Sequence, residues 1–143
     1  MNIIVRNDTF LVLNLEPKEE LHETLLNFCD AEGIIGGTFT GLGACSSASL
    51  AYYNLKSKSY EQHEIVEDLE ILSLTGNIGM LDGKSMLHVH GVFGRRGLST
   101  LGGHIFKLRV SGACEIHLTT LPTPLSRSFD EATGLNLLCG ITE

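Results

Sequence analysis

Three histidines have the residue type and the spacing that best suit a chemical role, namely the binding of a metal ion. His88 and His90 are separated by one residue, and His104 follows a glycine-rich segment, residues 94–103. On a β-strand such a pair points to one face, with the two residues about 6.5 Å apart. Both rings can then reach one ion, because a Zn–N bond is about 2 Å long. A hairpin through residues 94–103 would return His104 to the same region.

These three histidines predict a site for zinc or another divalent transition metal. Three histidines without a fourth protein ligand are typical of an open site, which holds a metal and a water. The alternative interpretation is that the rings are ordinary hydrogen-bonding groups of the core or the surface. His117 would be a fourth ligand only if the sheet brought its strand close, and His22 and His63 are poorer candidates.

Two arginines lie between the second and third of these histidines. Arg95 and Arg96 are candidate ligand-binding residues, because they could hold an anionic substrate or a phosphate over the metal. The alternative is a solvated loop tip. Glu70, Ser73 and Asn77 alternate, or nearly so, along one predicted strand and could add polar groups to the same cavity. No pattern identifies a general acid or base, so catalytic residues stay unassigned and the sequence does not decide whether the protein is an enzyme.

The glycine-rich segment 36–43 superficially resembles a phosphate-binding loop. It lacks the Lys-Ser/Thr pair of a P-loop, and it follows a predicted helix instead of opening one. Glycines that permit close packing or a bulge within a strand are therefore the preferred interpretation.

A helix is predicted over residues 18–32, and it is the one helix predicted with a clear hydrophobic face among the elements that must position the candidate site residues. Leu21, Leu25 and Phe28 recur at helical spacing on one face. Pro17 lies where a first helical turn could start, and Gly33 follows at the usual place of a left-handed C-cap.

The rest of the chain is predicted to be rich in strands. They are expected over residues 9–16, 34–42, 48–55, 60–66, 69–80, 86–93, 101–110 and 113–121. Turns at residues 56–59 and 81–84 are short, which favours antiparallel pairing. Residues 130–138 are expected to form a short helix. One early helix and many hairpins predict an α+β fold with a mostly antiparallel sheet.

Length and composition predict one globular domain over residues 1–143, of which 43% are hydrophobic. The net charge of −7, from 10 basic and 17 acidic residues, excludes a basic footprint over the whole surface, although a local basic patch stays open. No segment approaches the ~18 apolar residues of a membrane helix, and no signal peptide is recognised, so we expect a cytoplasmic protein without a membrane partner. The four cysteines are scattered, which predicts free thiols; they are Cys29, Cys45, Cys114 and Cys139.

Four segments, in order, resemble the PPC (plant and prokaryote conserved) domain family. The first is Leu69-Glu70-Ile71-Leu72-Ser73-Leu74-Thr75-Gly76-Asn77-Ile78. The second and third are Leu87-His88-Val89-His90-Gly91-Val92-Phe93-Gly94 and Gly102-Gly103-His104. The last is Arg127-Ser128-Phe129-Asp130-Glu131-Ala132-Thr133-Gly134-Leu135. The resemblance covers nearly the whole chain and identifies residues 1–143 as a PPC domain.

The resemblance implies a single α+β domain with a mostly antiparallel, about seven-stranded sheet flanked by a few helices, assembled as a homotrimer. It also implies the description "putative DNA-binding protein", which prokaryotic members carry by analogy with plant proteins. In the plant proteins an Arg-Gly-Arg segment, the AT-hook, enters the minor groove. This chain contains no Arg-Gly-Arg and resembles the stand-alone prokaryotic members. The family's histidines match His88, His90 and His104, an arrangement similar to the zinc ligands of acetolactate decarboxylase.

Three interpretations of function remain open. The first is a homotrimeric scaffold or regulator that binds another protein, or DNA indirectly. The second is a metal-dependent enzyme on a small carbonyl or carboxylate compound, in which the metal polarises an oxygen or activates a water. The third is direct DNA binding through a local basic face that trimer symmetry assembles; its residues would be Arg6, Arg95, Arg96, Lys107 and Arg109.

Overall fold

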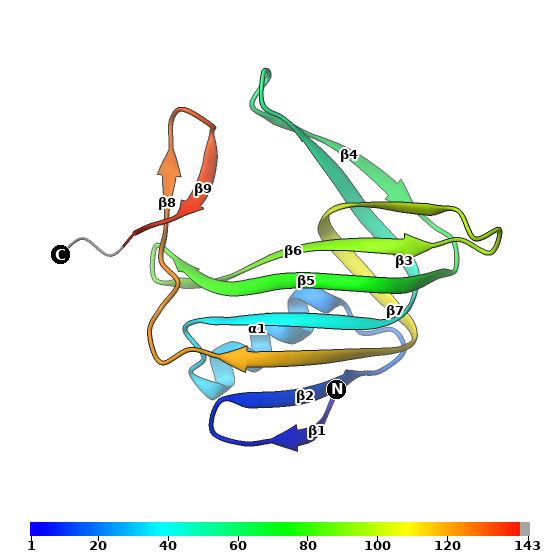
Figure 1. Ribbon diagram of the computed structural model, residues 1–143, viewed down its shortest axis with the longest axis horizontal. Helices are drawn as coiled ribbons and strands as arrows, with labels where there is room; N and C mark the ends of the chain where they lie inside the picture. The colour runs from blue at the N-terminus through cyan, green and yellow to red at the C-terminus, as the bar shows by residue number, and fades with distance from the viewer. Residues whose placement is uncertain (141–143) are drawn as a thin grey trace.

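A computed structural model, which describes residues 1–140, contains nine strands and one helix in that part of the chain (Figure 1). The elements are β1 (Asn2–Arg6), β2 (Phe10–Leu15), α1 (Leu21–Glu32), β3 (Gly37–Asn54), β4 (Ser59–Ile65), β5 (Leu69–Leu81), β6 (Lys84–Gly94), β7 (Thr100–Thr120), β8 (Arg127–Asp130) and β9 (Leu135–Leu138). The helix lies behind the sheet in Figure 1. It is not long and apolar enough to cross a bilayer.

Seven strands form one antiparallel sheet in the order β1-β2-β7-β6-β5-β3-β4. β3 also pairs with β7 along most of its length, so β3, β5, β6 and β7 make a closed ring of pairings. The hydrophobic core lies between this curved sheet and α1. The single-domain α+β prediction with a seven-stranded antiparallel sheet is confirmed.

Two pairs of predicted strands are each one long, curved strand. The expected breaks near residues 43–47 and 111–112 lie within β3 and β7, where the register shifts between Gly43 and Cys45. Gly43 has φ +153°, and a Cβ at this position would collide with the carbonyl oxygen of Ala113. A bulge with glycine therefore bends the strand without ending it.

The helix begins later than its hydrophobic period predicts. Lys18 has a left-handed φ of 77°, and Glu20 is the N-cap, whose side chain accepts a hydrogen bond from the N–H of Glu23. At the other end Gly33 has φ 66°, which confirms the predicted left-handed C-cap. The buried face carries the expected Leu21, Leu25 and Phe28, together with Cys29.

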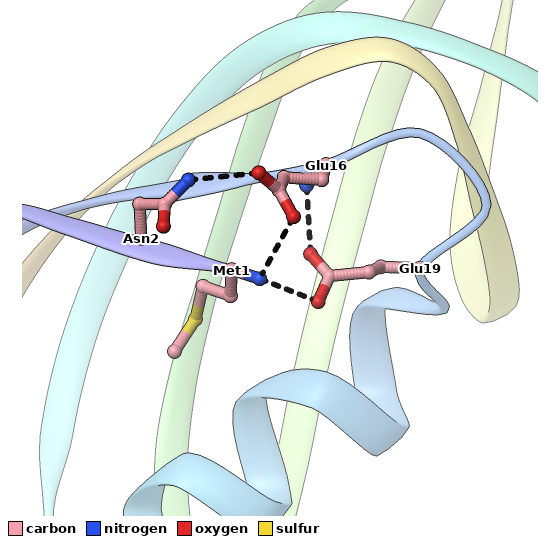
Figure 2. Close-up of polar contacts among 4 residues, drawn as sticks. All are labelled: Met1, Asn2, Glu16 and Glu19. Atoms are coloured by element: carbon pink, nitrogen blue, oxygen red, sulfur yellow. Dashed lines mark hydrogen bonds and ion pairs between the residues drawn. The ribbon is translucent and has the colours of Figure 1, made fainter.

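A strand that the sequence did not predict, β1, forms the sheet edge beside β2. Its first residue, Asn2, and the preceding Met1 contact the segment before α1 (Figure 2). The Met1 ammonium lies 2.6 Å from Glu19 Oε1 and 3.8 Å from Glu16 Oε2, and Asn2 Nδ2 donates to Glu16 Oε1 at 2.9 Å. The N–H of Glu16 donates in turn to Glu19 Oε2 at 2.7 Å. These contacts tie β1 to the segment that leads into α1.

The predicted helix over residues 130–138 is wrong, because this segment belongs to the hairpin β8–β9. Asp130 Oδ2 accepts hydrogen bonds from the N–H and hydroxyl of Thr133, and Gly134 has φ 76°. This turn chemistry favours a hairpin over helix. Tyr53 fixes the hairpin to the main sheet through a 2.6 Å hydrogen bond to the carbonyl of Thr133.

The cysteines are free thiols, as predicted. Cys29, Cys45 and Cys114 are buried, and burial raises the pKa of each to about 12. Cys139 is exposed.

Candidate metal centre

The three predicted histidines meet on one face of the sheet, where β6 pairs with β7. Leu87 and Val89 are buried toward the core, so the alternation of β6 turns His88 and His90 to the opposite face. His104 lies directly across from His90 in the antiparallel register. The predicted hairpin through the glycine-rich segment is therefore confirmed, with β6 ending at Gly94 and β7 starting at Thr100.

The ring nitrogens are close enough to share one ion. His90 Nε2 lies 3.2 Å from His88 Nε2 and 3.4 Å from His104 Nδ1, and one ligand atom of each residue lies within 4.8 Å of the others. Nitrogens on a tetrahedral zinc, with bonds of 2.0–2.1 Å, are roughly 3.3 Å apart. The donor set thus fits a zinc-sized ion.

Burial keeps two of the rings neutral. Burial, reinforced by the charges of Arg127 and His90, lowers the pKa of His88. Burial and the neighbouring histidines lower the pKa of His104 to about 4. A neutral imidazole has a lone pair to offer, so these two rings need not lose a proton before they bind a metal at neutral pH.

Two aromatic rings hold His104 in place. Its ring centroid lies 5.0 Å from that of Tyr60 on β4 and 4.8 Å from that of Phe106 on β7. Tyr60 and Phe106 also contact each other edge to face, with centroids 4.9 Å apart. The two side chains restrict the rotation of the imidazole and shield it from water.

Arg127 is a site residue that the sequence reasoning did not select. It is the first residue of β8, and its Nη2 lies 3.3 Å from His88 Nδ1. Nη2 also donates to Asn77 Oδ1 at 2.8 Å, and Nη1 donates to the carbonyl of Asn136 at 2.8 Å. A guanidinium has no acceptor, so this contact needs the lone pair of His88 Nδ1 and leaves the ring proton on Nε2. Metal binding through His88 Nε2 therefore competes with the Arg127 contact.

The histidine cluster lies between two hollows. One, of about 830 Å³, is open and extends over the sheet face, with His88, His90 and His117 among its lining residues. The other, of about 380 Å³, lies under the β8–β9 hairpin and is lined by His88, His104 and Arg127 among others. His117 thus shares a hollow with the cluster but is not among the three histidines whose ligand atoms converge.

The predicted ligand-binding arginines lie apart from these hollows. Arg95 and Arg96 are exposed in the loop between β6 and β7 and line neither cavity. Arg95 Nε donates to Glu67 Oε1 at 2.9 Å, an ordinary surface ion pair. Among the three polar residues suggested on β5, Asn77 lies at the cluster through Arg127, whereas Glu70 and Ser73 line neither hollow.

Comparison with known proteins places these features in a family. Residues 4–122 match the model of the Plants and Prokaryotes Conserved (PCC) domain, which is the PPC domain. The match stops before β8, so Arg127 lies outside it. No curated protein sequence matches the chain.

Two solved structures resemble nearly the whole chain. One is a "putative DNA-binding protein" from Bacteroides thetaiotaomicron, with 29% identity, 96% of each chain covered and a TM-score of 0.92. The other is a metal-containing protein from Archaeoglobus fulgidus, with 33% identity, 98% of this chain and 99% of that chain covered and a TM-score of 0.86.

Acetolactate decarboxylase from Bacillus subtilis shares the fold alone. Its sequence is 11% identical over 80% of this chain and 53% of the enzyme, with a TM-score of 0.58. The family model covers residues 4–122, which include all three histidines of the cluster. The chain belongs to the Plants and Prokaryotes Conserved (PCC, or PPC) domain family.

Proposed function

We propose that this PPC-domain protein binds one divalent transition metal, with zinc as the first candidate, through His88, His90 and His104. The observation that carries the proposal is the convergence of the three ring nitrogens from two paired strands. The metal-containing relative from Archaeoglobus fulgidus, at 33% identity, supports it. The metal would have open coordination positions, at which it could polarise an oxygen or lower the pKa of a bound water.

Elemental analysis tests this proposal. Tag-free protein purified without chelator should contain about one transition metal per subunit, as expected for a three-histidine site. The double variant His88→Ala/His104→Ala should lose the metal and keep its circular dichroism spectrum. His117→Ala is the matched control and should keep the metal. Absence of metal from the wild type, even after incubation with zinc, would leave the histidines with a structural role.

The protein is further proposed to be a homotrimeric scaffold or regulator in the cytoplasm, with a protein partner. The trimer rests on family membership, and the buried free thiols suit a reducing compartment. Direct DNA binding is the weaker candidate, since the net charge is −7. Two arginines of the suggested basic face also pair with glutamates, Arg6 with Glu32 and Arg95 with Glu67. Binding to random duplex DNA that weakens steeply with salt would favour the DNA-binding candidate again.

A second candidate is a metal-dependent enzyme on a small carbonyl or carboxylate compound. A three-ligand site with an adjoining cavity favours this candidate. Conversion of such a compound by the metal-loaded protein, lost in His90→Ala, would test it.

A further inference from the structure

Metal binding by the three histidines does not by itself account for the cavity under the β8–β9 hairpin. Its volume of about 380 Å³ falls in the range of small-molecule pockets, roughly 300–1,000 Å³. Tyr60, Phe106 and Leu135 contribute apolar surface, and His88 and His104 reach it from the metal centre. Among residues 1–140, no aspartate or glutamate lines it. The cavity therefore combines an apolar wall with a purely cationic or neutral polar wall.

Arg127 supplies the positive charge of this cavity. Its hydrogen bonds go to the neutral groups Asn77 Oδ1, Asn136 carbonyl and His88 Nδ1. The ion pairs found within residues 1–140 do not include Arg127. Its Nε is buried and has no hydrogen-bond partner in the described part of the chain.

A partly desolvated cation without a counter-ion is costly, and a buried donor without an acceptor adds to that cost. Arg6 and Arg95 show the usual alternative, since each pairs with a glutamate at the surface. Within residues 1–140, Arg127 therefore has no anionic partner, and a ligand in the adjoining cavity can supply one.

We propose that this cavity binds a small carboxylate, whose anionic group pairs with Arg127 and whose apolar body lies against Tyr60, Phe106 and Leu135. A planar guanidinium matches a carboxylate, and a single arginine suits a monoanion better than a phosphate, which recruits several donors. The enclosing hairpin suits a small molecule and not a polymer. The inference rests on the proposed function, because the carboxylate would lie beside the metal at His88 and His104.

Calorimetric titration with benzoate and with its neutral isostere benzamide tests the inference on metal-free and zinc-incubated protein. Benzoate should bind with a Kd of about 1 mM or tighter, and benzamide at least tenfold more weakly. Arg127→Gln should weaken benzoate binding at least tenfold. Arg96→Gln removes the same charge from the exposed loop and should change the Kd less than twofold.

A second readout protects the test against a variant that fails to fold. Proton NMR of the wild type should show contacts between benzoate and the rings of Tyr60 and Phe106. The variant Arg127→Lys should bind benzoate with an intermediate Kd, and its melting temperature should stay near that of the wild type. Binding no tighter than about 10 mM, equal affinity for benzamide, or loss caused by Arg96→Gln instead of Arg127→Gln would overturn the inference. Elemental analysis reports separately on the metal, so a protein that binds benzoate but takes up no zinc would contradict only the proposed metal function.

Discussion

The histidines meet because of strand geometry and not because of closeness in the sequence. His88 and His90 share a face through the two-residue period of β6, which their spacing predicted. His104 joins them because it is the direct cross-strand partner of His90. Its approach was predictable once the glycine-rich segment was interpreted as a hairpin.

Arg127 could not be placed in the same way. It lies 23 positions after His104 and reaches His88 through a separate hairpin whose docking depends on Tyr53 and on Arg127 itself. The arginines nearest to the histidines in sequence, Arg95 and Arg96, lie in the exposed loop between β6 and β7 and line neither of the two hollows. Sequence distance is a poor guide to charge placement when a terminal segment folds back onto the sheet.

At the residue scale, His104 should remain neutral in acid. Burial and the charges of its neighbours lower its pKa to about 4, so the ring of the metal-free protein should titrate near that value in nitrogen-detected NMR. Tyr60→Ala exposes the ring and should raise the pKa toward the ordinary value of about 6.5. Phe10→Ala, which removes a ring from His117, is the control and should leave the titration unchanged. A wild-type midpoint near 6.5 would contradict the burial argument.

The charge of Arg127 should oppose metal binding. Arg127→Gln removes a cation beside a proposed dication and frees His88 Nδ1 to carry the ring proton. The zinc affinity in a competition with a coloured chelator should therefore rise about tenfold, since such a repulsion costs roughly 1 kcal/mol or more even in water. Arg96→Gln is the control for the change in net charge. An unchanged or weaker affinity in Arg127→Gln would show that its role in positioning His88 outweighs its charge.

At the scale of the elements, the turns and the helix end were predictable and the bends were not. Gly33 and the turn at residues 81–84 follow local rules that hold in any fold. β3 and β7 each continue as one strand because they pair with neighbouring strands along their length. Gly43 therefore bends β3, although the local sequence pattern predicts that the strand ends there. Residues 130–138, which were predicted to form a helix, belong to the β8–β9 hairpin; Asp130 and Gly134 suit helix ends as well as turns, so local rules do not separate the two structures.

The N-cap of α1 should make stability depend on pH. Burial alone would raise the pKa of Glu20, but the His22 ring at 3.6 Å and the N–H groups of Glu23 and Leu108 lower it to about 2. A depressed pKa stabilises the fold above about pH 4.5, and this contribution is lost as the pH falls toward 2. Glu20→Ala should lower the free energy of unfolding by about 1–2 kcal/mol at neutral pH.

Urea denaturation at several pH values measures this effect. The difference between wild type and Glu20→Ala should shrink as the pH falls toward 2, because the protonated carboxyl loses its advantage as an acceptor. Glu70→Gln is the control, because Glu70 is an exposed acid whose side chain makes no hydrogen bond or ion pair within residues 1–140. A pH-independent difference would assign the loss to side-chain packing.

At the scale of the whole molecule, the exposed sheet face bears on assembly. Leu42, Leu72 and Val92 lie on the neighbouring strands β3, β5 and β6 and are 54%, 53% and 45% exposed. Ser73 pairs with Val92, which places Leu72 next to it across the strands. Adjacent exposed apolar side chains on a sheet are typical of an interface, and the proposed assembly is a trimer.

Light scattering coupled to size exclusion should therefore find a trimer. The double variant Leu72→Glu/Val92→Glu should dissociate this trimer, because burying two carboxylates per subunit in the interface costs several kcal/mol. Leu98→Glu, at a loop position that is 91% exposed, adds charge outside this face and should leave the trimer intact. The proposed metal ligand His90 is exposed two residues before Val92, so the same measurement with chelator separates two arrangements. A trimer that survives chelation does not need the metal for its assembly, whereas dissociation would make the metal part of the interface.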